Sequence, residues 1–298
     1  MLGDDIMKIN GVEIENTFSE GFHMVGTRFL ITADSLEWAR VAGQNAAGFA
    51  TSVIACGCEA DIESEFEVGP DGRPGVSVVI LTHNIQMLAS QTLARVGQCV
   101  LTCPTTACFN DVEGGQAVKV GSSLRYFGDG YQMSKLIFGR RFWRIPVMDG
   151  EFLVEEEFGS FEGASDGNII IIGRTRETTL KAAIEAVAAM RLSGSVILPF
   201  PGGIVRSGSK VGSKYNKLNA STNHMYCPSL SYLSDSDLSA DNNCCYEIVV
   251  CGEHEANVKR AMKAGIEAAA TEGIIRITAG NYGGSLGKVC IPLWELFS

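Results

Sequence analysis

Apolar and polar residues follow two different periods along most of this chain. Four times, a short run rich in Val and Ile precedes a longer segment with apolar residues at three- and four-residue spacing, and a second short apolar run follows. Short runs of this kind are typical of strands, and the longer segments of amphipathic helices. The predicted segments, three to a repeat, are 27–33, 34–47 and 49–56; 75–83, 84–96 and 98–103; 168–173, 176–191 and 195–200; 246–252, 253–272 and 273–280.

Capping residues stand where two of the predicted helices begin. Asp34 or Ser35 precedes the first helix and Asn84 the second, and their side-chain oxygens can accept a hydrogen bond from an N–H group of the first turn. In the last helix Val258, Met262 and Ile266 recur at four-residue steps. This spacing predicts one buried face on that helix.

Two such repeats in each half predict an α+β fold made of two ferredoxin-like (βαββαβ) lobes. We place the lobes at residues 1–150 and 151–298, with a connecting β-hairpin region at 121–159, where aromatic and polar residues alternate and FGDG and MDG provide turns. The hairpins belong either to the sheet core or to an arm that contacts a partner subunit. One doubly wound parallel sheet is the alternative fold, and it is disfavoured because no G-x-G-x-x-G follows a first strand.

Composition narrows the classes of partner. The net charge of −10 over 298 residues argues against nucleic acid, because phosphate contacts require basic surface. No apolar run approaches the ~20 residues that span a bilayer, and the N-terminus lacks the apolar core of a signal peptide. We therefore expect a cytoplasmic protein with no membrane partner.

The ten cysteines do not form a recognisable metal site. None of them makes paired C-x-x-C units, and the chain has only four histidines, so a structural zinc site is poorly supported. Disulfides are rare in cytosolic proteins. We expect no metal, and mostly buried cysteines that pack as small apolar side chains.

One long stretch of this acidic chain contains no carboxylate side chain. Residues 186–234 hold five Lys and Arg residues but no Asp or Glu, where the overall composition would place about five or six acids. Within it, residues 199–215 read PFPGGIVRSGSKVGSKY and offer N–H groups, hydroxyls and ammonium groups to an anion. The stretch predicts an anion-binding loop, and a solvated glycine-rich loop is the alternative. We expect His224, in the same stretch, to have a surface or packing role.

Glu247 interrupts an apolar strand. It lies in the run CYEIVVC, where alternation places Tyr246 and Ile248 on one side and Glu247 and Val249 on the other. If Glu247 is buried, its pKa is raised, and a protonated carboxyl can donate to an oxyanion or act as a general acid. If that side of the strand is solvated, Glu247 is an ordinary surface residue.

The motifs together resemble one enzyme family, the formylmethanofuran:tetrahydromethanopterin formyltransferases. The resemblance covers essentially the whole chain in nine blocks: INGVEIENTF (9–18), GFATSVIACGCEA (48–60), PDGRPGVSV (70–78), RVGQCVLTCPT (95–105), YFGDGYQ (126–132), PFPGGIVRSGSKVGSKY (199–215), ASTN (220–223), YEIV (246–249) and ITAGNYGGSLG (277–287). It implies two ferredoxin-like lobes and a dimer or dimer of dimers. It also implies no metal and no permanently bound cofactor, with methanofuran and tetrahydromethanopterin as co-substrates.

The implied activity is transfer of a formyl group between formylmethanofuran and N5 of tetrahydromethanopterin, in methanogenesis or formaldehyde oxidation. The resemblance assigns Glu247 a catalytic role, and direct transfer in a ternary complex is the simpler route because no nucleophile–base arrangement is recognisable. Both co-substrates carry anionic groups, which agrees with the acid-free stretch. The candidate substrate-binding residues are Gly202, Gly203, Ser207, Ser209, Lys210, Ser213, Lys214, Asn281 and Tyr282.

Family members also occur in complexes with formylmethanofuran hydrolase or dehydrogenase subunits. The alternative function is accordingly a non-catalytic scaffold subunit of a formyltransferase/hydrolase complex. Because Glu247 and its motif are present in this chain, the sequence favours the enzyme.

Overall fold

The chain forms two compact units. The computed structural model describes residues 6–239 and 244–298. Unit 1 contains the described residues of 1–22, 164–251 and 255–298, and unit 2 contains 23–163 and 252–254. Two long strands, β3 (Phe18–Thr32) and β10 (Phe161–Gly173), contribute residues to both units.

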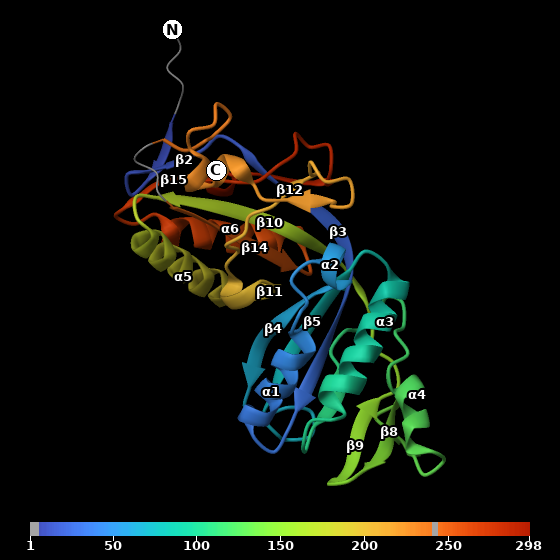
Figure 1. Ribbon diagram of the computed structural model, residues 1–298. Coiled ribbons are helices and arrows are strands. Elements are labelled where there is room, and N and C mark those ends of the chain that lie inside the picture. The colour runs from blue at the N-terminus through green and yellow to red at the C-terminus, as the bar shows by residue number, and fades with distance from the viewer. Residues whose placement is uncertain (1–5, 240–243) are drawn as a thin grey trace. The chain divides into compact units, whose positions relative to one another are not determined.

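Unit 2 is built on an antiparallel sheet, part of which Figure 1 labels as β4 (Glu59–Phe66) and β5 (Gly75–Thr82). β3 pairs with β5 and with β6 (Ala107–Asn110), and β4 pairs with β5, each pair antiparallel. The strand order is therefore β4-β5-β3-β6. These antiparallel pairs exclude a doubly wound parallel sheet for this unit.

Two helices with N-terminal caps pack against this sheet, α1 (Leu36–Ala47) and α3 (Ile85–Arg95). Ser35 Oγ accepts a hydrogen bond from the Trp38 N–H at 3.3 Å, and Asn84 Oδ1 accepts one from the Met87 N–H at 2.9 Å. Both side chains satisfy first-turn donors that would otherwise lack a helical partner. Of the two residues predicted to cap the first helix, Ser35 is the one that caps α1. The prediction that Asn84 caps the second helix is confirmed in α3.

The connecting region forms β-hairpins, as the alternating aromatic pattern predicts. After α4 (Gly121–Leu124) and a 3₁₀ turn, β7 (Met133–Ile137) pairs antiparallel with β8 (Arg140–Val147), which pairs antiparallel with β9 (Gly150–Glu155). β9 also pairs in parallel with β6. The hairpins therefore extend the sheet of unit 2, and their use as an arm onto a partner stays a prediction.

Unit 1 repeats the strand–helix–strand pattern. Its central strand β10 pairs antiparallel with β15 (Ile274–Thr278) and also pairs with β14 (Cys244–Gly252), which pairs with β11 (Val196–Ile197). The resulting order is β15-β10-β14-β11. Shorter strands complete the unit: β1 (Met7–Ile9), β2 (Val12–Ile14), β16 (Val289–Pro292), and the pair β12 (Lys210–Val211) and β13 (Ala220–Ser221).

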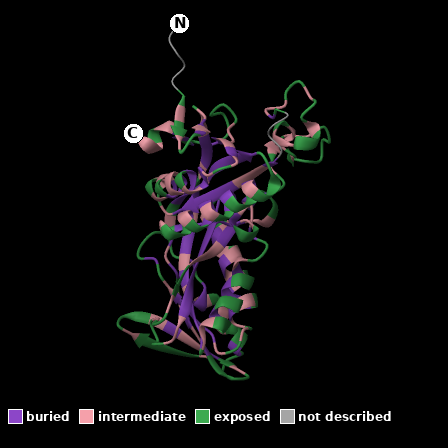
Figure 2. Ribbon diagram, turned by 90° about the vertical axis from the view of Figure 1, so that its left-hand side faces the viewer, coloured by how far each residue is buried: buried purple, intermediate pink, exposed green. Residues whose placement is uncertain are grey.

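The core of unit 1 lies between this sheet and two helices, α5 (Arg176–Leu192) and α6 (Glu255–Ala269). Ile169 and Ile171 of β10 and Ile248 and Val250 of β14 contribute to its sheet side, with Ile171 and Ile248 fully buried. Val258, Met262 and Ile266 of α6 are buried against it, which confirms the predicted helix face. Figure 2 shows the buried strands and the largely exposed outer sides of the helices.

Two predicted strands are wrong. Residues 49–56 contain the short helix α2 (Val53–Cys56), which ends at Gly57 in the left-handed conformation, φ 77°. The strand is β4, where Ala60, Ile62 and Phe66 alternate with acidic or polar residues. The predicted strand at 98–103 instead begins as a π-helical turn that continues α3, because buried Val96 and Val100 repeat at helical rather than strand spacing.

The remaining boundaries differ less. β11 covers only two residues of the predicted strand 195–200, since the chain enters a 3₁₀ turn at Pro201–Gly203. The compact units are bounded at 22/23 and 163/164, so the lobe boundary at 150/151 stays a prediction. No helix in the described part of the chain is long and apolar enough to cross a membrane.

Candidate active site

Glu247 lies on the sheet face of unit 1 opposite to the helices. Its neighbours Ile248 and Val250 are buried in the core with α5 and α6, so strand alternation directs Glu247 to the other face. A β-bridge joins Glu247 to Val205: the Val205 N–H donates to the Glu247 carbonyl at 2.7 Å, and the Glu247 N–H to the Val205 carbonyl at 3.1 Å. This bridge fixes the acid-free loop beside the candidate catalytic residue.

A small pocket opens at Glu247. It encloses about 50 Å³, enough for one or two water-sized groups. Its lining comes from three parts of unit 1, namely β10, the first half of β14, and the loop between β11 and β14. Arg206, Ser207 and Gly208 belong to this lining together with Glu247. The structure therefore brings part of the predicted anion-binding loop to the predicted acid.

The surroundings of Glu247 favour its protonated form. Burial and, secondly, the negative charge of Asp166 raise the pKa of Glu247 to about 7. Burial also raises the pKa of Asp166. Both effects act in the same direction, because an ionised carboxylate loses water on burial and is repelled by a second carboxylate. The pair therefore retains a proton to higher pH than two exposed carboxylates would.

Asp166 is a residue of this site that the sequence did not predict. It sits in β10 with φ 63°, in the left-handed region, and its backbone carbonyl accepts hydrogen bonds from Ser19 Oγ and Asn168 Nδ2. An Asp–Gly pair inside an otherwise apolar strand signals a local irregularity, and the run SDG at 165–167 was such a signal.

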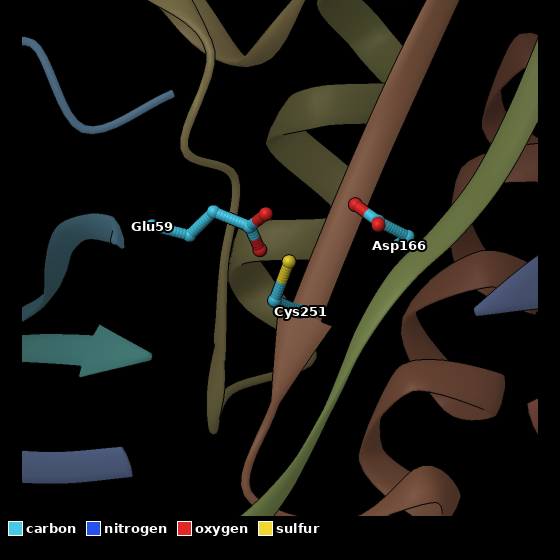
Figure 3. A group of neighbouring side chains, drawn as sticks. All are labelled: Glu59, Asp166 and Cys251. Carbon is cyan, nitrogen blue, oxygen red and sulfur yellow. The ribbon is translucent and has the colours of Figure 1, made fainter. Parts of the chain in front are cut away.

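Asp166 and Cys251 project from neighbouring strands of unit 1, as Figure 3 shows. The carboxylate oxygen and the Cys251 Sγ lie within 4.8 Å of each other. Figure 3 also draws Glu59, which belongs to unit 2. The two donors of unit 1 are fewer than the three or four protein ligands of a zinc site.

The predicted loop residues fall into two groups. Ser207 lines the pocket and Ser209 lies two residues farther along, whereas Gly202 and Gly203 form the preceding turn with φ 64° and 79°. A Cβ on Gly203 would lie 2.9 Å from Val187 Cγ1. The structure thus gives Gly203 a packing role and does not place it in the pocket lining.

Lys210 is held in a polar chain. Its Nζ lies 2.7 Å from His224 Nδ1, and His224 Nε2 lies 2.5 Å from Asp235 Oδ2. This geometry fits a neutral His224 that donates to Asp235 and accepts from Lys210. Ser213 Oγ accepts from the Tyr215 N–H within a turn, and Lys214 is exposed. His224 therefore links two charged residues rather than facing the pocket.

Asn281 and Tyr282 differ in their contacts. Asn281 Nδ2 donates to Thr17 Oγ1 at 3.0 Å and to the Phe18 carbonyl at 3.1 Å, while its Oδ1 accepts from the Gly283 N–H. These bonds use most of its polar capacity to hold its own loop against the beginning of β3. Burial and the nearby Glu247 charge raise the pKa of Tyr282, which places this phenol in the electrostatic environment of the candidate acid.

Comparison with known proteins identifies the family. The model of the formylmethanofuran-tetrahydromethanopterin formyltransferase family matches residues 7–147, and the model of its proximal lobe matches residues 150–296. The formylmethanofuran–tetrahydromethanopterin formyltransferase of Methylococcus capsulatus is 51% identical over 98% of this chain and 100% of its own length. That of Methanosarcina acetivorans is 49% identical over 98% and 100%.

Solved structures agree with the sequence comparison. The formyltransferase of Methanosarcina barkeri has a TM-score of 0.93 at 48% identity, covering 98% of this chain and 100% of that one. A chain of the formyltransferase/hydrolase complex from Methylorubrum extorquens, solved with methylofuran, has a TM-score of 0.96 at 43% identity over 99% of each chain. The chain described here belongs to the formylmethanofuran-tetrahydromethanopterin formyltransferase family.

Proposed function

We propose that this chain transfers a formyl group between formylmethanofuran and N5 of tetrahydromethanopterin, by direct acyl transfer in a ternary complex. The observation that carries the proposal is the protonation-prone carboxyl of Glu247 in a pocket lined by the acid-free loop. Family membership supplies the reaction and the two co-substrates. Glu247 is the catalytic residue of this proposal.

The chemistry needs an acid at this position. N5 of the pterin attacks the formyl carbon, the carbonyl π electrons move to oxygen, and a tetrahedral intermediate forms. When the intermediate collapses, the bond to the methanofuran nitrogen breaks, and that nitrogen takes a proton as N5 loses one. A neutral Glu247 can donate a hydrogen bond to the oxyanion or a proton to the leaving nitrogen. Its raised pKa keeps that proton available near neutral pH.

The acid-free loop supplies the complementary charge. Arg206 is exposed at the pocket, and Lys214 is exposed farther along the same loop. We assign them, with Ser207 and Ser209, to binding of the anionic parts of the substrates. Lys210 contributes through its place in the chain with His224 and Asp235, which fixes the ammonium group. Gly202, Gly203, Ser213 and Asn281 shape the loops that carry these groups.

The two units support a ferredoxin-like description of the lobes. In unit 2 the first, second, third and fourth strands of the repeat are β3, β4, β5 and β6, in spatial order 2-3-1-4. In unit 1 the first, second, third and fourth strands of the repeat are β10, β11, β14 and β15, in spatial order 4-1-3-2. These are the same order read from opposite ends, and it is that of a βαββαβ motif. Superposing residues 27–110 on residues 168–278 of an experimental structure tests this, and non-matching strands would contradict it.

The chain's partners follow from its relatives. A relative from Methylorubrum extorquens, 46% identical over 94% of this chain, is named as one of the subunits of a formyltransferase/hydrolase complex. We propose that this chain assembles as a dimer or dimer of dimers in the cytoplasm, alone or with formylmethanofuran hydrolase subunits. Light scattering of the purified chain tests self-assembly. Co-purification from the native host, after fractionation, tests the complex and the compartment.

The function itself is tested with purified chain and both co-substrates. Formyl transfer from formylmethanofuran should occur with tetrahydromethanopterin and should be much slower with tetrahydrofolate. A chain that is folded and assembled but transfers no formyl group to either acceptor would show the scaffold function instead. Turnover with tetrahydrofolate alone would show a different formyltransferase.

A further inference from the structure

The buried carboxylate of Glu20 is the centre of a loop at the edge of the candidate site. It is 3% exposed and accepts four backbone hydrogen bonds from one short segment. The N–H groups of Tyr282 and Gly284 donate to Oε2 at 2.7 and 3.0 Å, and those of Leu286 and Gly287 donate to Oε1 at 2.5 and 2.6 Å. Four N–H donors on one carboxylate are the arrangement of an anion-binding nest.

Apart from the bonds to Glu20, the segment 282–286 is held by a few polar contacts, including those from Gly283 to Asn281 Oδ1 and from Ser285 Oγ to the Tyr282 carbonyl. All five of its residues are exposed, and its large side chains Tyr282 and Leu286 are 38% and 44% exposed, so no apolar core fixes its path. Gly283 and Gly284 have φ of 69° and 72°, a conformation open to glycine that lets alternate N–H groups converge on Glu20. The conformation of this segment is therefore fixed mainly by its hydrogen bonds to the Glu20 carboxylate and not by side-chain packing.

The charge of Glu20 is part of this arrangement. Burial acts to raise the pKa of Glu20, but the donors from Gly287, Tyr282, Leu286 and Gly284 outweigh it and lower the pKa below its ordinary value. A neutral amide in the same place would present an NH₂ group to two of the four donors. The segment would then lose acceptors for N–H groups that point at this buried site, which is costly.

Tyr282 connects this segment to the pocket of Glu247. Its hydroxyl donates a long hydrogen bond, 3.5 Å, to the Ser209 carbonyl. Ser209 directly follows Gly208 and Ser207, which line the pocket, and this stretch begins at the bridge between Val205 and Glu247. One end of the anion-binding stretch is thus fixed by β14, and the other end contacts Tyr282.

We propose that Glu20 is a positioning residue for formyl transfer: its carboxylate fixes segment 282–287 so that Tyr282 supports the substrate-binding stretch 206–209 over Glu247. Glu20 touches no substrate in this proposal and acts through Tyr282. The proposal rests on the proposed function of the Glu247 pocket, which the turnover of the unmodified enzyme tests separately.

The test uses Glu20→Gln, Tyr282→Phe and the double variant, with Glu267→Gln as the matched control because Glu267 is an exposed carboxylate on α6. Glu20→Gln should raise KM about tenfold, as expected for the loss of charge-assisted hydrogen bonds, with kcat changed less than about threefold. Tyr282→Phe should raise KM by a smaller factor. The double variant should be no worse than Glu20→Gln, because the two residues act in series.

Hydrogen exchange gives a readout that needs no substrate. The amides of Tyr282, Gly284, Leu286 and Gly287 should exchange about tenfold faster or more in Glu20→Gln, and at unchanged rate in the control. A purely structural defect would lower the folded fraction and hence kcat, with KM unchanged. That pattern, additive effects in the double variant, or faster exchange without a rise in KM would each overturn the proposal.

Two outcomes remain, and both are decisive. If Glu20→Gln does not fold, Tyr282→Phe alone carries the test, and an unchanged KM in that variant overturns the proposal. If the unmodified enzyme shows no formyl transfer, the proposed function fails. In that case the exchange rates still decide whether Glu20 organises the segment.

Discussion

Glu247→Gln is the most informative single change, because the structure predicts opposite effects on activity and on stability. The pKa of Glu247 is raised from 4.5 to about 7. At about 1.4 kcal/mol per pKa unit, the ionised form costs the folded state at most about 3.5 kcal/mol. Glutamine keeps the shape and removes the ionisation. It also removes the proton that a general acid must donate.

The sign of the stability effect follows from proton binding. Below pH 4.5 Glu247 is protonated in the folded and the unfolded chain and contributes no difference. Between pH 4.5 and about 7 the unfolded chain releases this proton and the folded chain retains it, so the parent protein loses stability as the pH rises. Glu247→Gln should therefore match the parent near pH 4.5. It should become more stable by up to about 3.5 kcal/mol above pH 7.

Two measurements check this reasoning. Urea unfolding at several pH values from about 4.5 to about 8.5 gives the free energy of unfolding, and steady-state kinetics give kcat and KM. We expect kcat to fall by about 10²–10⁴, the usual effect of losing a general acid, with KM little changed. If Glu247 acts only as a hydrogen-bond donor to the oxyanion, Gln retains much of the rate and Glu247→Ala loses it.

Glu267→Gln is the control for both measurements, since its carboxylate is exposed on α6 and should change neither. A stability difference that does not vary with pH would contradict the raised pKa. Nearly parental turnover in both Glu247→Gln and Glu247→Ala would refute the catalytic assignment, whatever the stability data show.

Three further changes test other parts of the site. Asp166→Asn removes the charge that helps raise the pKa of Glu247, so the alkaline limb of the kcat/KM profile should move to lower pH. An unchanged limb would show that Asp166 does not influence the ionisation of Glu247. Lys214→Ala should raise KM more than it lowers kcat, and should weaken the salt dependence of KM, whereas Lys181→Ala on α5 should do neither. Gly203→Ala should cost about 1–3 kcal/mol in unfolding experiments, because its Cβ would meet Val187 at a positive φ; a raised KM at parental stability would instead return Gly203 to the binding site.

Periodicity predicted the elements that bury one regular face. The helix with Val258, Met262 and Ile266 and the strands 168–173 and 246–252 were recognisable because they repeat apolar positions at helical or strand spacing. The strand Glu59–Phe66 was missed because its alternation is carried by only three apolar residues among acids. The run at 98–103 was misread because a short apolar run is equally compatible with a buried helical turn.

The candidate site was predictable only in part, for a related reason. Glu247 stood out because a carboxylate inside an apolar strand has few structural explanations. Asp166 and Glu20 did not, because their importance lies in contacts with residues 81 and more than 260 positions away in the sequence. No local pattern records such a contact.

The sequence alone determined which residues could form strands and helices, and on which side of its strand Glu247 would lie, since both depend on neighbours within a few positions. Tertiary structure decided whether that side of the strand was exposed to solvent and which carboxylate lay beside Glu247. It decided which part of the acid-free loop lines the pocket. It also decided that segment 282–287 closes on Glu20. A pKa depends on burial and on nearby charge, and both are properties of the packed chain rather than of any segment within it.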